Sequence, residues 1–318
     1  MVNIDKNQLY EVFRRKLIDE KLILCNDTIN VREIHPFKYN GDIICHHIIT
    51  VEQNQKKYFV RTIKEKDYSC LVASYLNSLN DISKRILFPC AITSPFTICN
   101  QSYVFTTYLE GEDLESQNEK LSSKELLEIS NRIDNNLNIV HSVSSEKYSN
   151  GKQFVDNAFS EIMFYNIYMQ FYNQYNIFAK NVDVDKLLVT VNSILTQSHF
   201  SKPTLVHMDI KPANIILSPQ KDVYLIDFEL SRFADLDYEW TNLLIKMLHS
   251  YDERFKRYVL TPIIEKNFMP LEKAILVDKY KVYLLYLAIN KYLYCLKNGI
   301  LCPRAIIDFS YQIINQLV

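Results

Sequence analysis

The sequence predicts an α+β protein with a small, sheet-rich N-terminal part and a larger, mainly helical C-terminal part. Two observations indicate the sheet: β-branched and aromatic residues are concentrated at about 40–64 and again at 102–109. A third observation indicates the helices, because a capped amphipathic pattern begins at Ser122 and helical patterns continue from 239 to the end of the chain.

The boundary between the two parts is predicted at a turn. Glu110-Gly111-Glu112 directly follows the last strand pattern of the N-terminal part. We therefore expect an N-terminal lobe over residues 1–108 and a C-terminal lobe over residues 109–318.

The N-terminal part begins with an amphipathic helical pattern over 7–24. Lys56-Lys57 marks a hairpin turn between two strands, the second of which covers 58–63. A helix is expected over 70–80, and a strand over 102–109 leads to the predicted boundary.

The C-terminal part begins with a capping box, since Glu125 follows Ser122 at the spacing that lets each side chain satisfy the other's backbone. A second helical stretch, rich in aromatic residues, is expected near 156–180. Three short strand patterns follow, at 204–206, 214–217 and 223–227. In the helical region after 239, the expected helix boundaries are Pro262, Pro270 and Pro303.

Composition excludes several classes of protein. The 318 residues are 48% apolar and carry a net charge of −1, which indicates a folded chain and argues against a nucleic-acid binder held by bulk positive charge. The longest clean apolar run near the C-terminus, Val282–Ile289, has 8 residues, whereas a membrane span needs about 20. Seven scattered cysteines without Cys-x-x-Cys spacing favour reduced thiols, so we expect a cytoplasmic protein without a membrane span.

Glycine is scarce, and this bears on nucleotide binding. The chain has only four glycines, and no two of them lie close together. A P-loop or a Rossmann fingerprint needs several neighbouring glycines, because the backbone must approach phosphate without an intervening Cβ. Neither motif is therefore present.

Residues 203–240 carry the residues best suited to chemistry. Asp209, Asn214 and Asp227 each sit at the edge of an apolar run. A tight turn and a hairpin would bring Asp227 back beside Asn214, and a carboxylate with an amide oxygen makes a site that suits Mg²⁺ with phosphate oxygens. Asp209 would then be available to accept a proton from a hydroxyl.

This segment resembles the protein-kinase-like superfamily, in the pattern His207-x-Asp209-x-x-x-x-Asn214 followed by Asp227-Phe-Glu229. Within it, the chain is most similar to the aminoglycoside phosphotransferase and choline kinase branch. The short acidic stretch after Asp227, which ends at Glu239-Trp240, is typical of that branch and leaves no room for a protein-kinase activation loop. The hinge-like segment 103–114 and the helix ending at His141 add to the similarity.

The resemblance implies a protein-kinase-like two-lobe fold and a role for each matching residue. Asp209 would be the catalytic base, or would orient the acceptor hydroxyl, and Lys211 would neutralise the transferred phosphoryl group. Asn214 and Asp227 would ligate the Mg²⁺ that bridges the phosphates of ATP. His207 would fix the loop.

The resemblance also implies the nucleotide contacts of the N-terminal lobe. Arg61 would contact the α- and β-phosphates, and Phe59, on the same strand face, would cover the adenine. Thr106, Thr107 and Tyr108 would offer backbone groups to the adenine edge.

Three departures from the family pattern keep other interpretations open. Tyr39-Asn40-Gly41-Asp42 is the only candidate phosphate loop and has one glycine, and Ser69 or Val72 falls where a glutamate partner for Arg61 is expected. Glu239 occupies a position where the family has aspartate.

We therefore expect an ATP- and Mg²⁺-dependent kinase that phosphorylates a hydroxyl of a small molecule, such as a sugar, an amino alcohol or an antibiotic. The alternatives are a protein kinase, which Lys211 favours, and a non-catalytic nucleotide-binding module, which the missing glycine loop and glutamate favour.

Overall fold

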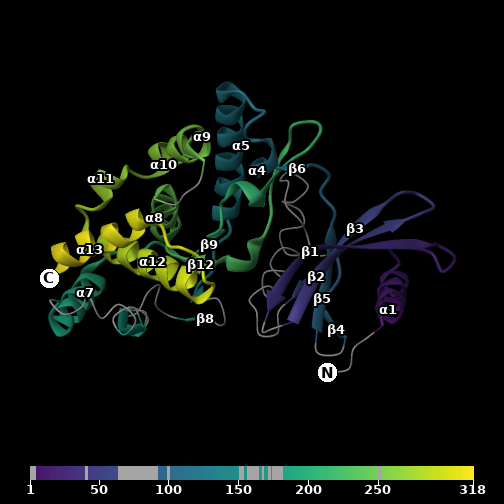
Figure 1. Ribbon diagram of the computed structural model, residues 1–318, viewed down its shortest axis with the longest axis horizontal. Coiled ribbons are helices and arrows are strands. Elements are labelled where there is room, and N and C mark those ends of the chain that lie inside the picture. The colour runs from purple at the N-terminus through teal and green to yellow at the C-terminus, as the bar shows by residue number, and fades with distance from the viewer. Residues whose placement is uncertain are drawn as a thin grey trace. The chain divides into compact units, whose positions relative to one another are not determined.

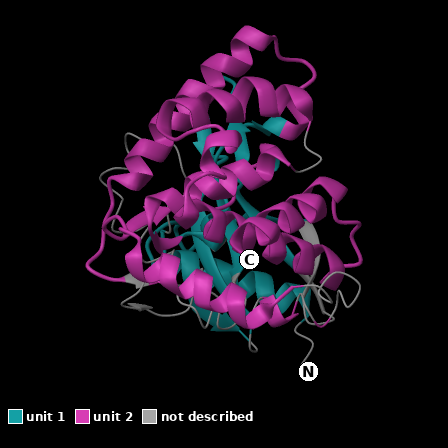
Figure 2. Ribbon diagram, turned by 90° about the vertical axis from the view of Figure 1, so that its left-hand side faces the viewer, with its two compact units in different colours: residues 1–114, 213–231 teal, residues 115–212, 232–318 magenta. Residues whose placement is uncertain are grey.

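The computed structural model describes residues 5–39, 42–63, 92–98, 101–149, 154–155, 165–166, 168–170, 173, 182–248 and 252–318. The chain forms two compact units, coloured separately in Figure 2. The first unit contains residues 1–114 and 213–231, and the second contains 115–212 and 232–318. The expected division of the chain into lobes after residue 108 stays a prediction.

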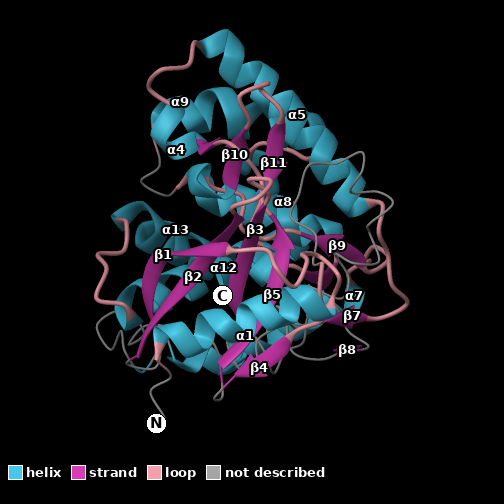
Figure 3. Cartoon of the chain, turned by 90° about the vertical axis from the view of Figure 1, so that its right-hand side faces the viewer, coloured by secondary structure: helices cyan, strands magenta, loops and turns pink. Residues whose placement is uncertain are grey.

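The first unit is built on a five-stranded antiparallel sheet with the strand order β1-β2-β3-β5-β4. A helix at the N-terminus covers one of its faces (Figure 3). The helix and strands of this layer are α1 (Lys6–Asp19), β1 (Ile29–Tyr39), β2 (Asp42–Val51), β3 (Lys57–Ile63), β4 (Phe96–Ile98) and β5 (Gln101–Thr107).

Alternation along β3 gives the sheet two different faces. Tyr58 and Val60 are buried in a core that includes Phe13 and Leu17 of α1. Phe59 and Arg61 lie between them in sequence, so their side chains point to the opposite face. The hydrophobic core therefore determines which side chains of this strand face away from α1 and are available to bind a ligand.

β1 was not among the predicted strands, because its sequence obscures the strand pattern. Pro36 lies inside it, and proline is usually a sign against a strand interior. The register of β1 with β2 shifts between Ile34 and Phe37, so the proline falls at an irregularity where a ladder hydrogen bond is not required.

The first unit also contains a three-stranded sheet of order β11-β10-β6, from β6 (Glu112–Asp113), β10 (Ile215–Leu217) and β11 (Val223–Leu225). The predicted hairpin between 214–217 and 223–227 is confirmed by the antiparallel pairing of β10 with β11. A short helical turn, η3 (Phe228–Leu230), follows β11.

Helices dominate the second unit, as predicted. The capping box at Ser122 and Glu125 is present, with each side chain bonded to the other's backbone N–H. The elements of this unit, with the two short helices at its borders, are α4 (Leu114–Gln117), α5 (Ser123–His141), β7 (Tyr148–Ser149), β8 (Phe154–Val155), α7 (Val184–Gln197), β9 (Thr204–Val206), η2 (Pro212–Asn214), β12 (Arg232–Ala234), α8 (Leu236–Met247), α9 (Glu253–Phe255), η4 (Lys256–Leu260), α10 (Thr261–Asn267), α11 (Leu271–Ala274), α12 (Asp278–Lys297) and α13 (Arg304–Leu317).

Helix α12 is the centre of the second unit. It contacts α7, α8 and α13 (Figure 1), and its run Val282–Ile289 is buried on every side of the helix. A helix that is apolar all round belongs in a protein interior. Among the described residues, no helix is long and apolar enough to cross a membrane.

Several predicted features fall on residues outside those described. They are the helix over 70–80, Asn40 and Gly41 of the candidate phosphate loop, Ser69 and Val72, and most of the stretch 156–180.

Gly111 provides a test of the packing between β10 and the start of β6. Its φ is +152°, and a Cβ built there would lie 2.2 Å from the backbone oxygen of Leu217. We expect Gly111→Ala to lower the free energy of unfolding by more than about 2 kcal/mol, because both the clash and the backbone strain must be relieved. Urea unfolding measures this change.

Gly299→Ala is the matched control. Gly299 also has a positive φ, of +65°, but its substituted Cβ would meet nothing within 4 Å. Backbone strain alone should cost about 1 kcal/mol. Equal losses in the two variants would contradict the role assigned to the Leu217 contact.

Candidate active site

The loop that follows β9 is fixed by hydrogen bonds to its backbone. Met208 has φ of +65°, a strained conformation for a residue other than glycine. The backbone N–H groups of His207 and Met208 both donate to the carboxylate of Glu239, at 3.0 and 2.9 Å to Oε1, and the Nδ2 of Asn242 donates to the Met208 carbonyl at 2.7 Å. The backbone immediately before Asp209 is therefore fixed by hydrogen bonds to both its N–H and its carbonyl groups.

Glu239 is completely buried on α8. Besides the loop, its Oε2 lies 2.6 Å from the Nε2 of His141 at the end of α5. Burial raises the pKa of this carboxyl, but the bonds from His141 and the loop outweigh it, and the net direction is down. Glu239 thus stays charged and ties α5, α8 and the loop together.

His207 is a fully buried structural residue of this loop. Its Nδ1 accepts a hydrogen bond from the backbone N–H of Asp209 at 3.2 Å. An Nδ1 that accepts a hydrogen bond carries no proton, so this ring is fixed in one tautomer and one orientation.

The carboxylate of Asp209 lies between two lysines. The Nζ of Lys211 is 2.6 Å from Oδ2, and the Nζ of Lys246, on α8, is 2.9 Å from Oδ1. Burial would raise the pKa of Asp209, but the two ammonium groups hold it well below its usual range. The two lysines therefore stabilise the ionised form of Asp209.

The hairpin β10–β11 returns the chain to Asn214, as the sequence predicts. Ile215 pairs with Leu225, and the backbone N–H of Ile226 donates to the carbonyl of Asn214 at 3.0 Å. Asp227 follows immediately, with φ of +63°, and its side chain is about one-third exposed. The hairpin therefore holds the chain at Asn214 directly beside the chain at Asp227.

Arg61 and Asp227 are in direct contact, although 166 positions separate them in sequence. The Nη2 of Arg61 donates to Oδ1 of Asp227 at 2.6 Å. The family resemblance implies a different role for each, phosphate contact for Arg61 and metal ligation for Asp227, and the glutamate that partners the basic residue in the family pattern is missing from this sequence. Among the described residues, Asp227 fills the place of that partner.

Two of the predicted adenine contacts, Phe59 and Thr106, lie on the face of the sheet away from α1. Phe59 pairs with Thr106, so the two residues share this face with Arg61. The Oγ1 of Thr106 is buried and has no hydrogen-bond partner among the described residues. Thr107 pairs with Tyr58 and is exposed, and Tyr108 directly follows β5.

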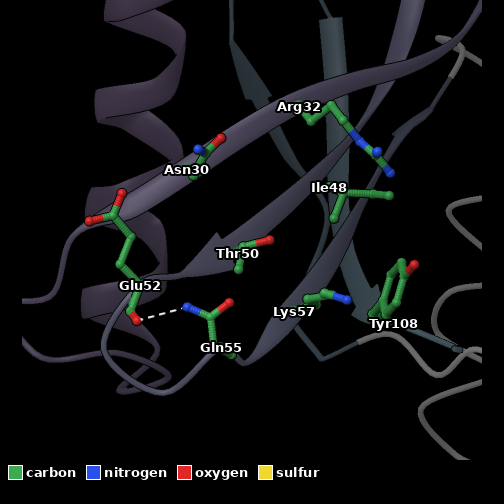
Figure 4. Close-up of a pocket in the computed structure, with 8 residues that line it drawn as sticks. All are labelled: Asn30, Arg32, Ile48, Thr50, Glu52, Gln55, Lys57 and Tyr108. Carbon is green, nitrogen blue, oxygen red and sulfur yellow. Dashed lines mark hydrogen bonds between the residues drawn. The ribbon is translucent and has the colours of Figure 1, made fainter.

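A hollow of about 570 Å³ opens on this same face, where Tyr108 leaves the sheet (Figure 4). The Nζ of Lys57 lies 5.2 Å from the centre of the Tyr108 ring. The hollow combines this aromatic ring with two cationic side chains, and the residues lining it are Asn30, Arg32, Ile48, Thr50, Glu52, Gln55, Lys57 and Tyr108.

The described part of the chain contains no cluster of three or more His, Cys, Asp or Glu side chains that could hold a metal ion. The predicted metal pair, Asn214 and Asp227, is a smaller set and needs oxygen atoms from elsewhere to complete a coordination shell.

Comparison with known sequences identifies the family. Residues 50–261, more than half of the chain, match the sequence model of the phosphotransferase enzyme family. The chain belongs to this family. A search of curated proteins found no match.

Solved structures show the fold of this phosphotransferase. Aminoglycoside phosphotransferase APH(4)-Ia has a TM-score of 0.60 and 11% identity, with 97% of each chain covered. A protein from Haemophilus somnus assigned as a fructosamine-3-kinase has a TM-score of 0.60 and 13% identity, again over 97% of each chain. An ethanolamine kinase from Plasmodium vivax has a TM-score of 0.56 and 15% identity, over 99% of this chain and 90% of its own.

These comparisons confirm the predicted fold class, a protein-kinase-like fold with two lobes. Variants of a thermostable mutant of APH(4)-Ia have been crystallised in ternary complexes with ADP and hygromycin B, and with AMP-PNP and hygromycin B.

The sequence did not predict two residues of α8 that contact the loop carrying Asp209 in this phosphotransferase, Asn242 and Lys246. Both lie on the face of α8 that carries Glu239, at spacings of three and seven residues. That spacing was the available signal: polar residues on one stripe of an otherwise apolar helix.

Glu239→Ala tests whether one carboxylate holds the loop. The change leaves the buried donors of His207, Met208 and His141 without their acceptor, so we expect the free energy of unfolding to fall by about 3–5 kcal/mol. Chemical unfolding of the intact chain measures the loss. Glu128→Ala, on the exposed face of α5, is the control and should stay within about 0.5 kcal/mol. A small effect at Glu239 would refute the assignment.

Proposed function

We propose that this phosphotransferase transfers the γ-phosphoryl group of MgATP to a hydroxyl of a small molecule, such as a sugar, an amino alcohol or an antibiotic. The observation that carries the proposal is the contact between Arg61 and Asp227. It joins a basic and an acidic group suited to phosphate and metal, beside Asn214 and within one compact unit.

The first unit offers a coherent set of contacts for a nucleotide. Arg61 would donate to phosphate oxygens, which a guanidinium binds well. Phe59 would cover one face of the base, and the backbone of Thr106, Thr107 and Tyr108 would meet its edge. The buried Thr106 hydroxyl supports this fit, because a ligand in this position would supply the partner that the described residues do not.

Asn214 and Asp227 are suited to Mg²⁺. Mg²⁺ prefers hard oxygen ligands and is commonly held by one or two protein groups together with water and phosphate oxygens. Bound there, the ion would neutralise charge on the phosphates. Asp227 would bind it through its part-exposed carboxylate, and the β10–β11 hairpin would keep Asn214 beside it.

The acceptor hydroxyl would be met by Asp209. The two ammonium groups beside it stabilise its ionised form, so we assign it chiefly the role of accepting a hydrogen bond and aligning the attacking oxygen. Phosphoryl transfer through a loose transition state depends chiefly on such positioning. Lys211, with its Nζ at the same carboxylate, would balance charge on the phosphoryl group in transit.

A labelled-ATP screen against a pool of hydroxyl-bearing metabolites tests the function. We expect label in one or more small molecules with the natural chain. Asp209→Asn keeps the shape of the side chain but removes its charge, and should lower the initial rate about 10²–10⁴-fold while MgATP still binds. Asp308→Asn, on the exposed surface of α13, is the control.

Two results of the screen would count against the proposal. Label that enters added proteins and no small molecule would favour a protein kinase. Unchanged transfer by Asp209→Asn would remove Asp209 from the reaction.

Asp227→Asn tests the metal assignment. Loss of the carboxylate charge should weaken nucleotide binding in the presence of Mg²⁺ at least about tenfold, because a hard cation binds a neutral amide less well than a carboxylate. Titration calorimetry with AMP-PNP, in Mg²⁺ and in EDTA, measures the difference. Identical affinities for the two proteins in Mg²⁺ would rule out Asp227 as a ligand.

A further inference from the structure

We propose that Lys246 is a positioning residue for phosphoryl transfer, which holds the Oδ1 atom of Asp209 so that the Oδ2 side of the carboxylate faces the acceptor. This inference rests on the proposed function, since it assigns Lys246 a task only if Asp209 aligns the acceptor hydroxyl.

One face of α8 contacts the Asp209 loop residue by residue. Glu239 accepts hydrogen bonds from the N–H groups of His207 and Met208, Asn242 donates to the Met208 carbonyl, and Lys246 reaches Asp209. Positions three and seven residues apart lie on one side of a helix, so a single rigid element holds the whole loop.

The contact made by Lys246 differs in kind from the other two. Glu239 and Asn242 bind backbone atoms and would hold this turn whatever side chain followed it. Lys246 binds the carboxylate itself, 2.9 Å from Oδ1. Its contact therefore acts on the functional group of Asp209 and not on the path of the chain.

Lys246 is buried, and burying a charged side chain has a free-energy cost that must be compensated. The side chain of Lys246 is only 11% exposed, and lysines are almost never buried without a partner. Desolvation lowers the pKa of its ammonium group and the charge of Asp209 opposes this, while Lys211 and Lys291 are the neighbouring cations. An apolar residue would fill the same space without the cost of burying a charge.

The two lysines at Asp209 are not equivalent. Lys211 is 34% exposed, so it can leave the carboxylate to meet an incoming phosphate, whereas Lys246 is fixed in the interior. When Lys211 moves, Lys246 still holds the carboxylate ionised and in place. Oδ2 is bound by the more exposed of the two lysines, so we assign the Oδ2 side to the acceptor.

Lys246→Met tests the proposal with the labelled-ATP assay and the metabolite pool described above. We expect the rate of transfer at saturating MgATP to fall about 10–100-fold, as expected when a reacting group is misplaced. The affinity for AMP-PNP with Mg²⁺ should change less than about twofold. Lys291→Met makes the same chemical change at the other cation near Lys246 and should alter the rate less than about twofold.

A double-mutant cycle separates positioning from a general structural effect. In an Asp209→Asn background there is no carboxylate charge to hold, so adding Lys246→Met should lower the rate no further. A merely structural lysine would lower the rate by the same factor in both backgrounds, and that result would overturn the inference. Thermal unfolding checks that each variant is folded, and Lys246→Gln, which keeps a donor without the charge, serves where Lys246→Met does not fold.

The assay also separates the two proposals. If the natural chain labels no small molecule, the proposed function fails and the inference fails with it. The outcome differs if the natural chain transfers phosphate and Asp209→Asn lowers the rate as predicted. If Lys246→Met and Lys246→Gln then leave the rate unchanged, only the inference about Lys246 fails.

Discussion

The part of the structure that carries Asp209 depends on one buried carboxylate. Glu239 has no exposure to water, so its charge must be balanced by donors inside the protein. Its oxygens are met by the N–H groups of His207 and Met208 and by the ring of His141. These donors come from two segments far apart in sequence. The carboxylate is required because each donor would be a buried, unsatisfied group without it. The strained turn at Met208 persists because this network determines it.

In the first unit, a simpler constraint arranges the side chains. Helix α1 buries Tyr58 and Val60, and strand geometry then turns Phe59 and Arg61 to the other face. The pairing of β3 with β5 puts Thr106 on that face too. The core is thus the physical reason that an aromatic ring, a guanidinium and a buried hydroxyl share one surface. Their combination suits a nucleotide, but it arises first from the need to cover the sheet with a helix.

The sequence predicted most of what depends on local patterns. The capping box at Ser122, the strand over 58–63 and the hairpin that returns to Asn214 all follow from spacing and residue type. β1 was missed because Pro36 hides its pattern, and only the register with β2 shows where the proline is tolerated. The partners of Arg61 and Asp209 could not be predicted either. The polar stripe of α8 marks Lys246 but not its partner, and no local period encodes contacts that join segments 166 and 37 positions apart.

The electrostatics at Asp209 favour one of the two roles that the sequence left open for this residue. A carboxylate between two ammonium groups is a poor proton acceptor, since protonation would sacrifice both ion pairs. The same two contacts fix its orientation, and a fixed acceptor lone pair is what aligns a hydroxyl for in-line attack. Because a loose phosphoryl-transfer transition state places little demand on early proton removal, alignment can contribute more than basicity. In the proposed reaction Asp209 would therefore act chiefly by orienting the hydroxyl.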